Sequence, residues 1–419
     1  MNVADQEAAE SDLPIWARKK AFPAAGDGYG WIDRKGGRHV CDSLDDLSRV
    51  IREDKDSVLD LVWTPECKHC RIPEEIEDFT EDISKVREGW AREDLLDANH
   101  RMKICGGGLA ALLAWMTFQA WRVYQVRGRD EGFFAEVKWI VTALSASTTV
   151  GIALLVFLVF AFIPWYQAQK RAREMKRAGG AVAPKIPLIR FETWLHMQKA
   201  PVTWGLLGVL GVVFAAQVWF DKSIISFHDT VNDAGLVKGA YRSGEYWRLF
   251  TAPMLHGGVI HFVMNGLGLL YLGKRLEVFA RWPHLFMVFV FSAMVGGEAS
   301  ARFMPQAPSV GASGGLMGWL GFLLVFETLH SKLVPKSSRR RLIGGVLITA
   351  LIGLVGYRFI DNAAHFGGLL AGMAYAGIVF PKSGSVLRPR MTLTDRVVGT
   401  ASLGVIVASA IYAVIRMAG

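Results

Sequence analysis

The sequence is poor in cysteine and in charge for a chain of its length. Four cysteines among 419 residues are too few for a disulfide framework. Charged residues make up 20% of the chain, below the roughly 25% that is usual in soluble domains. Hydrophobic residues make up 52%, glycine and tryptophan are abundant at 44 and 14 residues, and mean hydropathy is +0.27. This composition excludes a disordered chain, a secreted disulfide scaffold and a coiled coil, and it is typical of a membrane protein.

Acidic residues are scarce beyond the first hundred residues, and this divides the chain into two parts. Residues 1–100 hold 24 Asp and Glu against 14 Lys and Arg, whereas residues 101–419 hold 14 acids against 33 bases. The bases of the second part fall in clumps between apolar runs. This distribution indicates an acidic soluble domain followed by a membrane protein, and it is not that of a nucleic-acid binder.

The first hundred residues lack an apolar run that could cross a bilayer, and they lack the basic and apolar regions of a signal peptide. Turn residues at Lys35-Gly36-Gly37 and a helix start at Ser43 mark local structure. The patterns predict a hairpin over 28–40, a helix over 43–53 capped by Ser43, a strand over 58–62 and an acidic helix over 73–98. We therefore expect a small α+β domain.

From residue 104 onward the chain is a series of apolar runs close to the 20 residues that cross a bilayer core. The nine runs cover about 104–126, 140–165, 203–220, 252–272, 283–301, 309–328, 342–357, 362–380 and 397–415. The run at 342–357 is the shortest. We therefore expect an all-α polytopic membrane protein with this α+β domain at its N-terminus.

The basic clumps orient these expected spans, because positive charge collects in cytoplasmic loops. Four alternate loops carry the bases: Lys170, Arg171, Arg173, Lys176 and Arg177; Lys274, Arg275 and Arg281; Lys332, Lys336, Arg339, Arg340 and Arg341; and Lys382, Arg388, Arg390 and Arg396. Placing them inside leaves residues 1–100 in the cytoplasm and the C-terminus outside. The loop 127–138, with three bases and three acids, argues weakly for the reverse.

Polar residues within the apolar runs form three clusters, and groups at membrane depth are functional candidates by default. The first is His256, His261 and Asn265, where the four-residue step places His261 and Asn265 one helical turn apart. A polar stripe that bonds a neighbouring helix is the alternative interpretation.

The other two clusters open later runs. Gly311-Ala312-Ser313-Gly314-Gly315 begins one, and Ala364-His365-Phe366-Gly367-Gly368 begins another. Small residues of this kind usually serve close helix packing, and a buried His can also be a metal ligand. However, the predicted topology puts all three clusters at one depth near the outer face. A hydroxyl beside a histidine makes a nucleophile and its general base, and further donors nearby would stabilise an oxyanion.

Together these residues resemble the rhomboid family of intramembrane serine proteases over roughly 200–380. The string HGGVIHFVMN is similar to the family's HxxxxHxxxN pattern, GASG to its GxSG, and AHFGGLLAG to its AHxxGxxxG. Trp247 and Arg248 resemble the Trp-Arg pair of the first external loop. Gly273 and Glu277 resemble the Gly and Glu that close the second core helix.

The resemblance implies an enzyme with a Ser–His dyad and no acid, metal or cofactor. Ser313 would be the nucleophile and His365 the general base, and the oxyanion hole would consist of His261, Asn265 and the Ser313 amide. Trp247 and Arg248 would position the loop at the lipid interface, and Met317 replaces an aromatic residue that family members often stack on the catalytic histidine. The expected supporting residues are His256, Trp247, Arg248, Gly311, Gly314 and Met317.

The cysteines of the acidic domain allow a second kind of site. Cys67 and Cys70 form a C-x-x-C after a strand-like segment, but too few residues follow for a thioredoxin fold. Zinc bound by Cys41, Cys67 and Cys70, with His39 or His69, is an alternative. Reduced, unpaired thiols are the interpretation that we adopt for a cytosolic domain.

These observations predict five parts: an acidic cytoplasmic domain (1–100), a two-span hairpin (104–166), a basic cytoplasmic linker (167–201), a rhomboid-like six-helix protease core (202–381) and an additional helix (397–416). The predicted function is cleavage of single-span membrane proteins near the outer face of the bilayer. A catalytically inactive relative that binds or sorts membrane clients is the main alternative, and a transporter is a third. Because Met1 to Arg18 is too acidic for a transit peptide, we expect a bacterial inner membrane.

Overall fold

The computed structural model describes residues 10–54, 59–127, 132–177, 186–304, 306–357 and 360–419. The chain divides into two compact units. The first contains residues up to 21, 190–347 and 361–419, and the second contains 22–189 and 348–360. This division differs from the expected boundaries in three respects. The described residues 10–21 group with the helical core and not with the acidic domain, the expected linker 167–201 is divided at residue 190, and residues 348–357 of the expected core group with the second unit.

The second unit begins with a three-stranded antiparallel sheet of order β2-β1-β3, formed by Tyr29–Asp33 (β1), Arg38–Cys41 (β2) and Leu59–Trp63 (β3). Helix α2 (Leu44–Glu53) starts as predicted, since Ser43 accepts a hydrogen bond from the Asp46 N–H. Its apolar face packs on Val62 and Phe79. The predicted hairpin and capped helix are therefore confirmed, while Val58, the expected start of the third strand, lies outside the described residues.

Two short 3-10 helices (η3, Pro73–Glu75, and η4, Glu77–Phe79) lead into α3 (Thr80–Val126), which continues from the acidic segment into the first apolar run. Helix α3 packs against α4 (Phe133–Ala146), α5 (Thr148–Phe157), a π-helical turn (Leu158–Phe162) and α6 (Ile163–Arg177). The expected single span at 140–165 is wrong, because Ser147 ends α4 and caps α5 by accepting from the Val150 N–H. The apolar helix runs instead over Thr148–Arg177.

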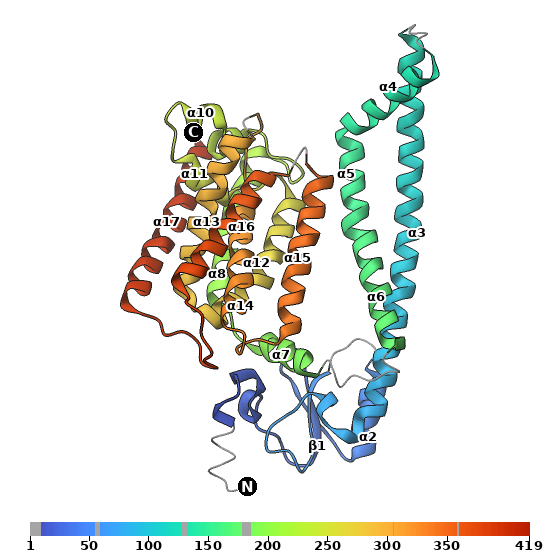
Figure 1. Ribbon diagram of the computed structural model, residues 1–419, viewed down its shortest axis with the longest axis vertical. Helices are drawn as coiled ribbons and strands as arrows, with labels where there is room; N and C mark the ends of the chain where they lie inside the picture. Colours follow the sequence, from blue (N-terminus) through green and yellow to red (C-terminus); the bar gives the residue numbers. More distant parts are fainter. Residues whose placement is uncertain (1–9, 55–58, 128–131, 178–185, 305, 358–359) are drawn as a thin grey trace. The chain divides into compact units, whose positions relative to one another are not determined.

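The first unit is a helical bundle in which α13, α14 and α16 lie side by side (Figure 1). Its longer helices are α7 (Ile186–Met197), α8 (Pro201–Asp221), α12 (Val259–Ala280), α13 (Trp282–Phe303), α14 (Ser313–Leu329), α15 (Lys336–Val355), α16 (Asn362–Val379) and α17 (Leu393–Ala418). The division between the units cuts α7 and α15. Short helices η1 (Ile15–Ala17), η2 (Lys19–Ala21), α9 (Asp229–Ala234), α10 (Lys238–Arg242), α11 (Arg248–Thr251) and η7 (Ala252–Met254) complete it.

Five helical segments among the described residues are long and apolar enough to cross a membrane: Glu77–Val126, Thr148–Arg177, α8, α13 and α17. A sixth is the pair Arg248–Met254 and α12, which meet at 89°. Helix α14 is apolar but short, and α15 and α16 do not meet this criterion. Helices α12 and α14 begin later than the expected runs at 252–272 and 309–328, and a glycine with positive φ explains each later start. Gly258 (φ +154°) precedes α12, and Gly311 (φ +122°) precedes α14.

Polar groups in the bundle are satisfied at helix ends. Glu277 accepts hydrogen bonds from the Val202 and Thr203 N–H groups and from the Thr203 hydroxyl, so it caps α8 from the neighbouring helix. A Cβ on Gly273 would lie 2.7 Å from Thr203, which explains why glycine precedes this glutamate by one turn. The predicted Gly and Glu pair thus serves helix packing.

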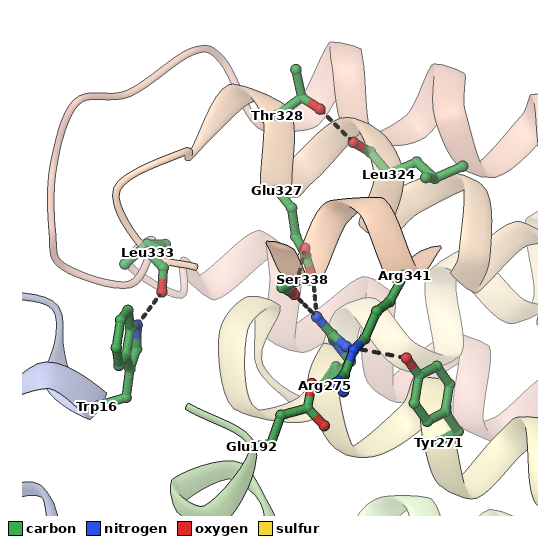
Figure 2. Close-up of polar contacts among 10 residues, drawn as sticks. All are labelled: Trp16, Glu192, Tyr271, Arg275, Leu324, Glu327, Thr328, Leu333, Ser338 and Arg341. Carbon is green, nitrogen blue, oxygen red and sulfur yellow. Dashed lines mark hydrogen bonds and ion pairs between the residues drawn. The ribbon is translucent and has the colours of Figure 1, made fainter. Parts of the chain in front are cut away.

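A buried ion pair joins α12 to the C-terminal end of α14. Arg275 and Glu327 are both fully buried and 3.0 Å apart, and the Ser338 hydroxyl bonds to both (Figure 2). Nearby, the half-exposed Arg341 pairs with Glu192 of α7. The charge of Glu327 is therefore balanced by Arg275 at the end of its helix. A carboxylate paired in this way offers no support for the ion pathway of a transporter.

The N-terminal segment docks beside this ion pair. The Trp16 indole donates to the Leu333 carbonyl at 2.8 Å (Figure 2). Its ring also meets Phe191 edge to face. The Arg190 guanidinium donates to the Trp16 and Arg18 carbonyls. These contacts explain why residues 10–21 group with the bundle.

We predict that removing one partner of the buried Arg275–Glu327 pair lowers the free energy of unfolding strongly. Removing Arg341 from its exposed pair with Glu192 should lower it little. Glu327→Ala leaves the Arg275 guanidinium buried and unpaired, which costs about 3–5 kcal/mol, whereas Arg341→Ala costs about 0–1 kcal/mol. Thermal unfolding in detergent measures both. Equal losses in the two variants would contradict the role of the buried pair.

Candidate active site

The predicted nucleophile and base open two helices that run in the same direction and touch backbone to backbone. Gly314 of α14 lies against Gly368 of α16, and Gly318 lies against Gly372 one turn further on, so closely that a Cβ on Gly368 or Gly372 would overlap the facing carbonyl. Since both pairs follow the same order, the helices are parallel. Ser313 and His365 occupy the first turns of these two helices.

Helix α13 supports this contact from the other side. A Cβ on Gly296 would lie 2.6 Å from the Ala364 carbonyl, and a Cβ on Gly367 would lie 3.2 Å from the Gly296 Cα atom. The residue before His365 is therefore held against α13. Small residues allow three helices to approach closely enough to place side chains from two of them at one point.

The side chains of Ser313 and His365 are both partly exposed. Within the described part of the chain, no hydrogen bond joins the two. Catalytic hydrogen bonds are often long without substrate, so this arrangement is compatible with a dyad that tightens on binding. The predicted contact of Met317 with His365 stays a prediction, and Met317 itself is buried one turn after Ser313.

The predicted oxyanion residues lie against the segment that leads to Ser313. A Cβ on Gly311 would lie 2.6 Å from His261 Cε1 and 2.8 Å from Nε2, and 3.8 Å from the Asn265 Nδ2 atom. Gly311 also has a φ of +122°, which L side chains rarely adopt. Its lack of a side chain thus allows His261 and Asn265 to lie against the segment two residues before Ser313.

Hydrogen bonds assign the tautomer of His261. The Gly257 N–H donates to His261 Nδ1 at 3.3 Å, so a neutral ring carries its proton on Nε2. That nitrogen faces Gly311. Asn265 uses one N–H on the His261 carbonyl at 2.9 Å and retains the second. Both side chains can therefore donate toward the start of α14.

The supporting role that we expect for His256 stays a prediction. Its ring is fully buried among Phe214, Phe262 and His261, and neither ring nitrogen has a partner among the described residues. Its backbone is held by Gln217, which accepts from the His256 N–H at 2.8 Å and donates to its carbonyl at 3.0 Å. Gln217 escaped the sequence analysis, although a lone amide in an apolar run was the available signal.

The Trp-Arg pair contacts other parts of the bundle, and its predicted role at the lipid interface stays a prediction. The Arg248 guanidinium is buried and donates to Glu245 and to the Asn232 and Gly235 carbonyls, so it fixes the loop after α9. Trp247 meets Tyr412 of α17 edge to face at 5.2 Å, with Arg416 5.1 Å from its ring. The additional C-terminal helix is thus part of the loop's support.

The cysteines form no comparable site. Among the described residues, no three His, Cys, Asp or Glu side chains come together as metal ligands, so the zinc alternative has no support there. Cys41, Cys67 and Cys70 are free. Burial raises the pKa of the Cys70 thiol, which disfavours the reactive thiolate that a redox site requires.

Residues 243–382 match the family model of the Rhomboid domain. The chain is 38% identical over 152 residues to "RHOMBOID-like protein 6, mitochondrial" of Arabidopsis thaliana, which covers 35% of this chain and 48% of that protein. It is 35% identical over 147 residues to "Rhomboid protease GluP" of Bacillus subtilis, covering 34% and 28% of the two chains. It is also 31% identical over 139 residues to "Inactive rhomboid protein 2" of Homo sapiens, covering 33% and 16%. The chain thus matches less than half of the length of each relative.

We predict that the backbone contact between α14 and α16 is intolerant of one added methyl group. Gly372→Ala would force the helices apart and destabilise the protein by about 1–3 kcal/mol. Gly377→Ala on the same helix is the matched control, because its Cβ would meet nothing within 4 Å. Thermal unfolding of both variants measures the difference, and a Gly372→Ala variant as stable as Gly377→Ala would contradict the packing argument.

Proposed function

The chain is a member of the rhomboid family through its domain at 243–382, and we propose that it is an active intramembrane serine endopeptidase. One observation carries the proposal: the glycine contacts of α14 with α16 bring Ser313 and His365 to the same end of two parallel helices. The apolar helices and the family domain make the protein an integral membrane protein. Ser313 and His365 are therefore the residues that would act on a transmembrane substrate.

In the proposed reaction the Ser313 hydroxyl attacks the scissile carbonyl, and His365 accepts its proton and passes it to the leaving amine. The carbonyl oxygen becomes negative in the tetrahedral intermediate. His261 Nε2–H, the second Asn265 N–H and the Ser313 amide at the start of α14 would donate to it. The partial exposure of Ser313, His261 and His365 supports access of water for the second, hydrolytic half of the reaction.

The position of the site within the bilayer follows from the charges around it. Ser313 and His365 open their helices, whereas the basic segments 332–341 and 382–396 follow the other ends of the same helices. If the basic segments are cytoplasmic, the site lies toward the outer face. We therefore propose cleavage of single-span membrane proteins near that face, with the N-terminus in the cytoplasm of a bacterial cell.

A catalytically inactive protein that binds membrane clients is the alternative function. Both residues of the proposed dyad are present, and the segment before Ser313 has the glycine that its contact with His261 requires. These features favour the enzyme.

We predict that Ser313→Ala and His365→Ala each abolish cleavage of a single-span reporter in proteoliposomes, while wild type cleaves it. Loss of either the nucleophile or its base removes the covalent step, so the rate should fall by at least about 10³-fold. A fluorophosphonate probe should label wild type and not Ser313→Ala. Cleavage by Ser313→Ala at the wild-type rate would rule out the dyad, and an inert wild type would favour the alternative function.

We also predict that His261→Ala lowers kcat by about 10²-fold or more and leaves KM nearly unchanged, because the lost donor acts on charge that develops only in the transition state. Initial rates over a range of reporter concentrations in the bilayer separate the two constants. A rise in KM at constant kcat would mean that His261 binds substrate and has no part in the oxyanion hole.

A further inference from the structure

Asp361 stands where three segments of the proposed site meet. It precedes α16, and its Oδ1 atom accepts from the Ala364 N–H at 2.9 Å, so it is the N-cap of the helix that carries His365. Its carbonyl accepts from the His365 N–H at 3.1 Å. Asp361 therefore fixes the first turn of α16, in which His365 lies.

The second carboxylate oxygen of Asp361 reaches outside its own helix. It accepts hydrogen bonds from the Ser300 hydroxyl of α13 and, at 2.5 Å, from the Ser309 hydroxyl. Ser309 lies four residues before Ser313 in the segment that leads into α14. One carboxylate thus bridges the helix of the base to the segment that delivers the nucleophile.

The segment around Ser309 is held from the other side as well. Ser309 exchanges two backbone hydrogen bonds with Leu236, of 3.0 and 3.1 Å, and the Gly311 N–H donates to the Ala252 carbonyl at 3.0 Å. Lys238 is only 3% exposed and donates to the Ala307 carbonyl. The negative charge of Asp361 attracts its ammonium group. Asp361 and these partners together therefore hold the segment in place.

We propose that Asp361 is a positioning residue for the reaction: through Ser309 and its own helix cap, it holds Ser313 and His365 at a fixed separation. This inference rests on the proposed function. It assigns Asp361 no proton transfer, so the dyad keeps its two members. Displacement of a reacting group by about 1 Å can cost about 10²-fold in rate. The bridge formed by Asp361 prevents such a displacement.

The experiment compares reporter cleavage and fluorophosphonate labelling in proteoliposomes for wild type, Asp361→Ala, Asp361→Asn, Ser309→Ala and Ser300→Ala. Asp361→Ala and Ser309→Ala should lower kcat and the labelling rate by about 10- to 100-fold, with KM within about twofold of wild type. Asp361→Asn should recover most of the loss, because the asparagine oxygen is also a good N-cap and its NH2 group can donate to the Ser309 hydroxyl, which then acts as acceptor. Ser300→Ala removes a hydroxyl from the same oxygen but leaves the link to Ser313, so its loss should be smaller.

Ser147→Ala is the control for a merely structural role, since it removes the N-cap of α5 in the second unit and none of the contacts of Asp361. It should lower the melting temperature and leave kcat unchanged. A wild-type kcat in Asp361→Ala, or an equal fall of kcat in Ser147→Ala, would overturn the proposal while leaving the dyad assignment intact. A wild type that neither cleaves nor labels would overturn the proposed function and the positioning role together.

Discussion

The contact of α14 with α16 is the constraint on which the rest of the bundle depends. Apolar helices gain little from hydrophobic burial against one another in a bilayer, so close packing of small residues must hold them together. Gly368 and Gly372 of α16 meet the Gly314 and Gly318 carbonyls of α14 with no room for a side chain. This closeness fixes the relative height of the two helices, because each glycine faces one carbonyl. Since a hydroxyl on one helix start can act with a histidine on the other only at that height, packing and proposed chemistry impose the same requirement.

Three carboxylates of the bundle follow a second rule, which is that each binds a neighbouring element. Glu277 of α12 caps α8, Glu327 of α14 pairs with Arg275 of α12, and Asp361 caps its own helix while binding α13 and the segment before Ser313. Each carboxylate therefore joins elements that are far apart in sequence. Unpaired charges at such positions would be expensive, so these groups specify which elements meet. His261 and Asn265 differ, because each retains a donor on the side that faces the segment before Ser313.

The elements that could be predicted from sequence are those with a local cause. The Ser43 cap, the turn at Gly36 and the apolar runs depend on nearby residues, and they were found near their expected positions. The candidate site could also be proposed from the family motifs, because Ser313, His365 and His261 lie in short strings. The partners of Asp361 and Arg275 could not be predicted, since Ser309 and Glu327 lie about 52 residues away from them along the chain. The contact of Trp247 could not be predicted for the same reason: its partner Tyr412 belongs to a helix outside the family motif.

That last contact bears on how a helix outside the family domain could influence the site. Helix α17 packs on α8, α9, α11 and α13, and Tyr412 and Arg416 flank Trp247. Trp247 precedes Arg248, which fixes the carbonyls at the end of α9. Leu236, just beyond α9, pairs with Ser309, and Ser309 binds Asp361. A continuous series of packed rings and hydrogen bonds thus runs from the added helix to the segment that carries Ser313. Because each step is a direct contact, the additional helix is a structural component of the proposed site and more than a membrane anchor.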